Sequence, residues 1–131
     1  MRIESLDHLV LTVTDLDATL AFYSGILGMN TEIFHPADGT VRTAIKFGQQ
    51  KINLHVRDAE FEPKAQHPTV GSADLCFLTQ EPLADWQTHL SKHNIVVAQG
   101  PVKRTGATGP ILSLYVRDPD GNLIEISVAR P

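Results

Sequence analysis

The sequence has little of several features that mark common functional classes. Its 131 residues include one cysteine, Cys76, which excludes an internal disulfide bond. No apolar run approaches the roughly 20 residues that a membrane-spanning helix needs. The 11 Lys and Arg residues are fewer than the 15 Asp and Glu residues and form no cluster, which argues against nucleic-acid binding. We therefore expect a small-molecule partner and neither nucleic acid nor membrane.

Composition and length point to an ordinary globular protein. Hydrophobic residues make up 42% of the chain and charged residues 20%, close to globular averages. At this length, the prediction is a single domain over residues 1–131. The stretch from Met1 to Glu4 lacks the apolar segment of a secretory signal, which predicts a cytoplasmic protein.

The first half of the chain predicts one helix among four strands. Residues 6–13 alternate in the manner of a strand. Thr14 and Asp17 resemble a capping box and Gly28 a helix stop, so a helix is predicted over about Asp15 to Leu27. Three strand-like runs follow, at Asn30–Phe34, Thr40–Phe47 and Lys51–Val56, which completes the order β-α-β-β-β.

The second half repeats this order after a polar connection of about residues 58–70. A strand is predicted at Ala73–Leu78 and a helix from Pro82 to about Asn94. Asp-Pro-Asp-Gly at 118–121 predicts a tight turn between two strands. The other strands are predicted at Ile95–Ala98, Ile111–Val116 and Leu123–Val128, so module one covers about 1–57 and module two about 71–131.

Matched positions support an internal repeat. His8 and Asp74 are 66 residues apart, as are Leu20 and Trp86. Repeats of this size usually mean that neither unit buries its sheet face alone. The prediction is an α+β fold of two tandem βαβββ modules in which equivalent positions converge.

Polar side chains stand on the presumed inner faces of the first and fourth strands. They are His8, either Asn53 or His55, Asp74 and Glu125. A carboxylate within a strand is costly to bury unless it is paired or binds a metal. Imidazole and carboxylate together suit a divalent ion such as Zn, Fe, Mn or Ni. Each position also has a purely structural alternative. His8 could be a hydrogen-bonded core histidine, and Asp74 could fix the start of its strand by bonding backbone amides. His55 and Glu125 could simply be exposed to solvent.

A second candidate is the segment from Lys103 to Pro110, which contains two glycines and two cations. It is predicted to be a loop between the sixth and seventh strands. Arg104 and Thr105 would then contact an anionic or oxygenated substrate from a mobile lid. The alternative is an ordinary hairpin loop.

Three segments together resemble the glyoxalase, bleomycin-resistance and extradiol-dioxygenase family, also called the vicinal oxygen chelate superfamily. They are residues 6–13, residues 19–29 with Thr19 to Tyr23 and Leu27-Gly28-Met29, and Tyr115 to Glu125 with its Asp-Pro-Asp-Gly turn. The resemblance spans nearly the whole chain. It implies two βαβββ modules that form a U-shaped, barrel-like metal cleft, usually in a homodimer.

The resemblance also implies specific metal ligands. His8 matches the first-strand histidine of the family and Glu125 the last-strand glutamate. Asp74 stands where the family commonly has histidine. Asn53 stands where glyoxalases have glutamate, with His55 two residues further on the same face. The implied set is His8, His55, Asp74 and Glu125, with Asn53 as the alternative to His55.

Three functions follow as hypotheses. The first is a metal-dependent lyase or isomerase of the glyoxalase type, similar to lactoylglutathione lyase, with Glu125 or Asp74 as the base that moves a proton. Its substrate would be a small oxygenated compound, such as a 2-oxoaldehyde or its thiol adduct. The second is a one-domain extradiol catechol dioxygenase. The third is a metal-free protein that sequesters a ligand, although such grooves tend to be aromatic and this chain has only 6% aromatic residues.

Overall fold

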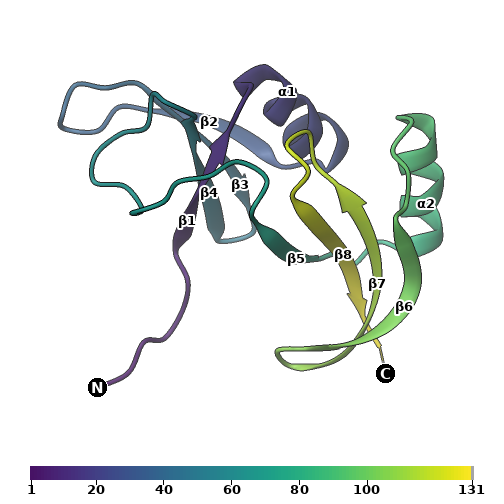
Figure 1. Ribbon diagram of the computed structural model, residues 1–131. Helices are drawn as coiled ribbons and strands as arrows, with labels where there is room; N and C mark the ends of the chain where they lie inside the picture. The colour runs from purple at the N-terminus through teal and green to yellow at the C-terminus, as the bar shows by residue number, and fades with distance from the viewer. Residues whose placement is uncertain (131) are drawn as a thin grey trace. The chain divides into compact units, whose positions relative to one another are not determined.

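The computed structural model describes residues 1–130, and the chain divides into two compact units, one ending at Val70 and the other beginning at Gly71. Each unit has one four-stranded sheet and one helical segment in the order β-α-β-β-β (Figure 1). The predicted α+β fold of two tandem modules is confirmed. Unit 1 contains β1 (His8–Val13), α1 (Leu16–Leu20), the π-helical turn η1 (Ala21–Ile26), β2 (Asn30–Phe34), β3 (Arg42–Phe47) and β4 (Gln50–Val56). Unit 2 contains β5 (Asp74–Leu78), α2 (Leu83–Lys92), β6 (Gln99–Gly106), β7 (Gly109–Arg117) and β8 (Leu123–Ala129).

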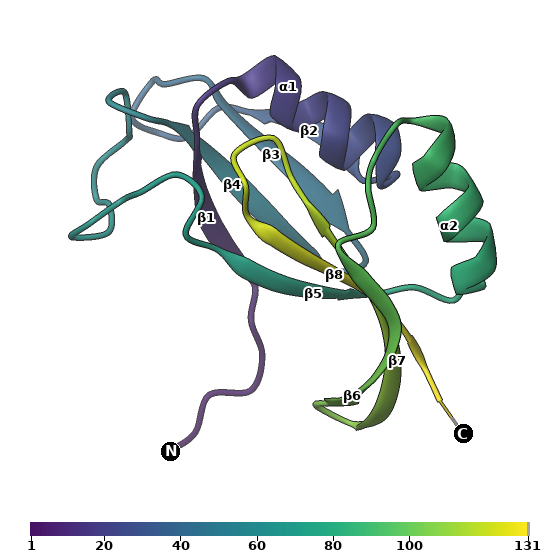
Figure 2. The ribbon, with the colours of Figure 1, turned by 45° about the vertical axis from the view of Figure 1, so that its right-hand side comes forward.

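The two sheets have the same topology. Their strand orders are β1-β4-β3-β2 and β5-β8-β7-β6. The pairs β1/β4 and β5/β8 are parallel, and the other neighbouring strands are antiparallel. Figure 2 shows β1 beside β4 and β5 beside β8. The first and fourth strands of each unit are therefore neighbours, although they are far apart in the sequence.

The N-cap of the helical segment in unit 1 lies one residue later than predicted. Asp15, not Thr14, is the N-cap, and its side chain accepts a hydrogen bond of 3.0 Å from the backbone N–H three residues on. The segment then continues as the π-helical turn η1, in which Leu27 N donates to Phe22 O, five residues earlier, at 2.9 Å. Gly28 ends the segment with φ +78°, a conformation that favours glycine. Over residues 1–130, no helix is both long and apolar enough to span a bilayer.

Each unit buries one side of its sheet beneath its helix. Alternation along the strands sends apolar side chains to that side and leaves polar ones on the other. Fully buried members of the two cores are Val13, Tyr23, Ile45 and Ile52 in unit 1, and Leu90, Leu114, Val116 and Ile124 in unit 2.

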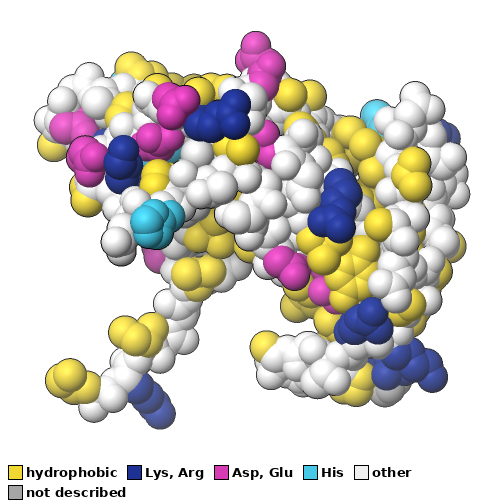
Figure 3. Space-filling model, in the orientation of Figure 1, with side chains coloured by type: hydrophobic (Ala, Val, Ile, Leu, Met, Phe, Trp, Pro, Cys, Tyr) yellow, Lys and Arg dark blue, Asp and Glu magenta, His cyan; other side chains and the backbone are white. Residues whose placement is uncertain are grey.

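The segment before β1 lies outside the sheet of unit 1. Its apolar side chains Met1, Ile3 and Leu6 are exposed (Figure 3). Two hydrogen bonds hold its end, because Gln50 Nε2 donates to Leu6 O at 3.1 Å and Lys51 N donates to Asp7 O at 3.4 Å. These three side chains therefore add nothing to the core of unit 1.

Two predictions for β6 are wrong. The strand predicted at Ile95–Ala98 lies at Gln99–Gly106, and the loop predicted at 103–110 is a β-hairpin whose turn is only residues 107–108. The pairing register shifts between Gln99 and Val102, which marks a bulge at Gly100-Pro101. Gly100 has φ +116°, and a Cβ there would collide with the Ser113 carbonyl oxygen. The Gly-Pro pair thus makes a bulge within a strand, beyond the point at which the predicted strand ended.

The predicted turn between β7 and β8 is confirmed, and Asn122 anchors it. The Asp118 carboxylate accepts bonds from the backbone N–H of Asp120 and Asn122, both at 2.9 Å. Asn122 Nδ2 donates to Asp118 Oδ2 at 2.7 Å, and Asn122 Oδ1 accepts from Ala73 N at 2.8 Å. Asn122 is fully buried, so it ties the turn to the start of β5.

Asn122→Ala is expected to lower the free energy of unfolding by about 2–4 kcal/mol, because it removes the hydrogen bonds that this fully buried side chain makes with Asp118 Oδ2 and with the Ala73 N–H. Urea unfolding followed by circular dichroism measures this change. Asn30→Ala is the matched control, since Asn30 is exposed and its replacement should cost less than about 0.5 kcal/mol. Equal stability of the two variants would contradict the anchoring role.

Candidate functional site

The first and fourth strands of each unit place polar residues at equivalent register positions. In unit 1, His8 pairs with Lys51, and Asn53 lies two residues further along β4. In unit 2, Asp74 pairs with Leu123, and Glu125 lies two residues further along β8. Residues two apart on a strand share a face, so each unit brings one such pair to one face. The two pairs have the same spacing.

His8 is held in a defined orientation at the start of β1. Its Nδ1 lies 2.7 Å from Asp7 Oδ2, and its side chain is 43% exposed. This hydrogen bond is the main cause that lowers the pKa of Asp7. A carboxylate on one ring nitrogen favours one tautomer and leaves the other nitrogen, Nε2, able to accept a ligand.

Asn53 carries a buried amide oxygen without a hydrogen-bond partner. Among residues 1–130 only two buried side-chain atoms lack such a partner, Asn53 Oδ1 and Glu32 Oε2. Glu32 Oε2 still has a cation nearby, because Lys46 Nζ lies 3.4 Å away. An unsatisfied buried oxygen costs about 1–3 kcal/mol, so Asn53 Oδ1 is well suited to accept a ligand.

His55 lies further along the same face. It pairs with Thr12 and lies four residues beyond Lys51, the partner of His8, which is about 13 Å along the strand at the usual rise per residue. Its ring is buried and packs edge to face on Phe61 at 5.4 Å. Burial lowers the pKa of His55, and the Arg42 guanidinium lowers it further. The structure does not bring His55 and His8 together.

The lowered pKa of His55 makes stability depend on pH. The unfolded chain has the ordinary imidazole pKa of about 6.5 and therefore binds more protons than the folded chain below that pH. The free energy of unfolding should fall as pH decreases through this window, by at most about 1.4 kcal/mol per pH unit from this group.

Urea unfolding at several pH values between about 7.5 and 5 tests this dependence. His55→Gln should flatten the slope, whereas His35→Gln should retain it because His35 is exposed. An unchanged slope in His55→Gln would contradict the prediction.

Cations lie beside the predicted ligands of unit 1. Lys51 is the direct partner of His8, and Lys46 is the direct partner of Lys51. The Lys51 ammonium lies 4.1 Å from the centroid of the Phe34 ring. This face can therefore attract anionic or oxygen-rich groups.

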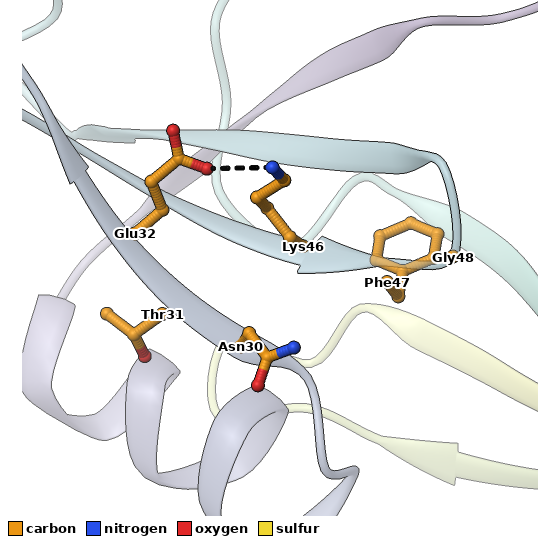
Figure 4. A pocket seen from close by; sticks show the side chains of 6 residues that line it. All are labelled: Asn30, Thr31, Glu32, Lys46, Phe47 and Gly48. Atoms are coloured by element: carbon orange, nitrogen blue, oxygen red, sulfur yellow. Dashed lines mark ion pairs between the residues drawn. The ribbon is translucent and has the colours of Figure 1, made fainter.

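A pocket of about 460 Å³ opens where β2 begins and β3 ends. Figure 4 shows Glu32 and Lys46 pointing toward each other in this region. Neither His8 nor Asn53 lines the pocket, although Glu32 and Asn53 share one face of the sheet because both pair with Ala44. The lining residues are Asn30, Thr31, Glu32, Lys46, Phe47 and Gly48.

Two buried hydroxyls support Glu125 in unit 2. Ser113 Oγ donates to Glu125 Oε2 at 2.6 Å, and Ser127 Oγ donates to the same oxygen at 3.4 Å. The two hydroxyls are themselves 2.7 Å apart, and both serines are fully buried. This network fixes the carboxylate on a half-buried strand position. Ser113 was not predicted from the sequence, although its place in strand alternation with Tyr115 was a usable signal.

The structure separates the two predicted substrate-binding residues. Arg104 and Thr105 are consecutive in β6, so their side chains point to opposite faces. Arg104 Nε donates to Tyr115 Oη at 3.0 Å, and Tyr115 pairs directly with Glu125. Arg104 thus lies on the face that carries Glu125, whereas Thr105 does not.

Cys76 is a further residue on this face. It pairs directly with Glu125 across β5 and β8, and its Sγ lies 3.3 Å from Ser127 Oγ. Burial is the main cause that raises the pKa of the Cys76 thiol, and the Glu125 carboxylate raises it as well. The thiol is therefore protonated and a poor nucleophile at neutral pH.

Asp74 is exposed at the start of β5. Within the described chain, no three His, Cys, Asp or Glu side chains gather closely enough to hold a metal ion. The structure therefore presents the predicted ligands as two pairs, His8 with Asn53 and Asp74 with Glu125, one on each unit.

The shared topology and the two equivalent polar pairs agree with the comparison to known families. The chain belongs to the Glyoxalase/Bleomycin resistance protein/Dioxygenase superfamily, whose family model matches residues 5–126. The resemblance noted in the sequence is thereby confirmed.

Individual relatives match over almost the whole chain. The glyoxalase domain-containing protein RDO1 of Mycosarcoma maydis is 57% identical over 127 residues, which is 97% of this chain and 69% of that protein. The crystal structure of virulence protein STM3117 from Salmonella typhimurium is 52% identical, with a TM-score of 0.91 over 99% of this chain and 100% of that one. The crystal structure of a lactoylglutathione lyase from Agrobacterium tumefaciens is 26% identical, with a TM-score of 0.70 over 98% of this chain and 96% of that one.

Proposed function

We propose that this chain is a metal-dependent enzyme of the glyoxalase type, a lyase or isomerase that acts on a small substrate with adjacent oxygens. The observation that carries the proposal is the matched spacing of His8 with Asn53 and of Asp74 with Glu125. The similarity to a lactoylglutathione lyase of known structure supports the same class of reaction.

The donor atoms fit a divalent ion. The set offers one imidazole nitrogen, one amide oxygen and two carboxylates, which suits Mn, Fe, Ni or Zn. Asn53 Oδ1 lacks a hydrogen-bond partner, and the Asp7 carboxylate orients the His8 ring through its hydrogen bond to Nδ1. A bound ion would supply Lewis-acid polarisation of the substrate oxygens. We favour Asn53 over His55 as the ligand because His55 lies too far along β4 from the partner of His8.

Glu125 is the proposed base. Its carboxylate would take a proton from the carbon next to a substrate carbonyl and return it to the neighbouring carbon. Ser113 and Ser127 hold Oε2, which keeps the carboxylate in place during the transfer. Arg104, with Tyr115, would contact substrate oxygens on the same face, and Lys51 would attract an anionic group beside His8.

The proposal requires the two ligand pairs to meet, either within one chain or between the chains of a homodimer. Mixing His8→Ala protein with Glu125→Ala protein distinguishes these cases. A site shared between chains should regain activity, because one of the two sites in a mixed dimer is then intact. A site within one chain should remain inactive in the mixture.

Elemental analysis of the purified, tag-free protein tests the proposal. The protein and a His8→Ala, Glu125→Ala double variant are loaded with Zn, Ni, Mn and Fe(II) in turn. We expect about one ion per metal site in the unaltered protein and none in the variant, after which the preferred ion guides assays with 2-oxoaldehydes and thiols. Equal metal content in both proteins would overturn the proposal and favour a ligand-sequestering protein.

A further inference from the structure

Helix α2 carries three rings that contact one another in succession, Trp86, His89 and His93. The Trp86 and His89 centroids are 5.6 Å apart, and the His89 and His93 centroids are 4.8 Å apart at an interplanar angle of 66°. Residues three and four apart on a helix lie on the same face, so the two imidazoles are neighbours. His93 is exposed and His89 half-buried, so solvent reaches the pair.

We propose that His89 and His93 form a two-imidazole binding site for a divalent transition-metal ion, separate from the predicted ligands on the sheets. Two imidazoles on one ion, with metal–nitrogen bonds of about 2.0–2.1 Å, have ring centroids roughly 4.5–5 Å apart. The observed 4.8 Å lies within that range, so the two rings are close enough to share one ion once rotation of the side chains brings one nitrogen of each ring toward it.

The location also favours a cation. His93 is the C-cap of α2, where the helix dipole presents its negative end. Imidazole is a good ligand for Zn, Ni and Cu, and Cu(II) binds most tightly in this series. The remaining coordination positions would be filled by water, because within the described chain no third His, Cys, Asp or Glu completes the site. This inference does not depend on the proposed enzymatic function.

Trp86 provides a local readout, since it is the only tryptophan in the chain and its ring contacts that of His89. Bound Cu(II) quenches indole fluorescence at short range. The titration uses full-length protein carrying His8→Ala and Cys76→Ser, which removes one predicted ligand on the sheets and the oxidisable thiol. It is carried out above the ordinary imidazole pKa of about 6.5, since only unprotonated imidazole binds metal.

We expect saturable quenching by about one Cu(II) per chain. His93→Gln or His89→Gln should each weaken the Cu(II) affinity by about 100-fold, the usual gain from tethering a second ligand. His67→Gln, an exposed histidine elsewhere, is the control and should not change the titration. Circular dichroism verifies that each variant is folded. Unsaturable quenching, or an unchanged affinity in folded His93→Gln, would overturn the proposal.

Discussion

Glu125→Gln is expected to reduce turnover of a 2-oxoaldehyde–thiol adduct by roughly 10²–10⁴-fold, the usual contribution of a positioned general base. The amide keeps the size of the carboxylate and can still accept the hydrogen bond from Ser113, but it cannot take up a proton. Turnover is measured as formation of the thioester product, and the metal content is measured on the same samples.

Glu81→Gln is the matched control for this variant. Glu81 is an exposed carboxylate of the same unit, so its replacement should leave turnover unchanged. Unchanged turnover in Glu125→Gln with its metal retained would exclude Glu125 as the base and leave Asp74 as the candidate. Loss of both metal and turnover would instead place Glu125 mainly among the ligands.

Asn53→Leu is expected to act in opposite directions on stability and on metal binding. It removes a buried oxygen that lacks a hydrogen-bond partner, so the metal-free protein should gain about 1–3 kcal/mol in its free energy of unfolding. It also removes a proposed ligand, so metal affinity should fall by at least the roughly 10–100-fold known for residues that support metal ligands. Urea unfolding and metal titration measure the two effects.

His55→Gln decides between the two candidate ligands on β4. We expect it to leave metal affinity unchanged, because His55 is buried against Phe61 and lies opposite Thr12. If His55→Gln lowered metal affinity and Asn53→Leu did not, His55 would be the ligand and the choice of Asn53 would be wrong.

Local patterns in the sequence were sufficient for most elements of the fold. Alternation between polar and apolar residues predicted seven of the eight strands near their observed positions, because a half-buried strand imposes that period. The β6 strand was misplaced because Gly100-Pro101 usually ends a strand. Its bulge depends on close contact with Ser113 in β7, a residue 13 positions away that local pattern cannot include.

The sequence by itself determined the repeat and the residue types at its equivalent positions, including His8, Asp74 and Glu125. It did so because the same fold in both halves requires the same spacing of strands, helix and turns. Only the tertiary structure decided how neighbouring strands are aligned. That register separates His55 from His8, leaves Asn53 Oδ1 without a partner, and places Ser113 against Glu125. The reason is physical: pairing register and burial arise from contacts between segments far apart in the chain, whereas sequence periodicity reports only which face of its own segment a residue occupies.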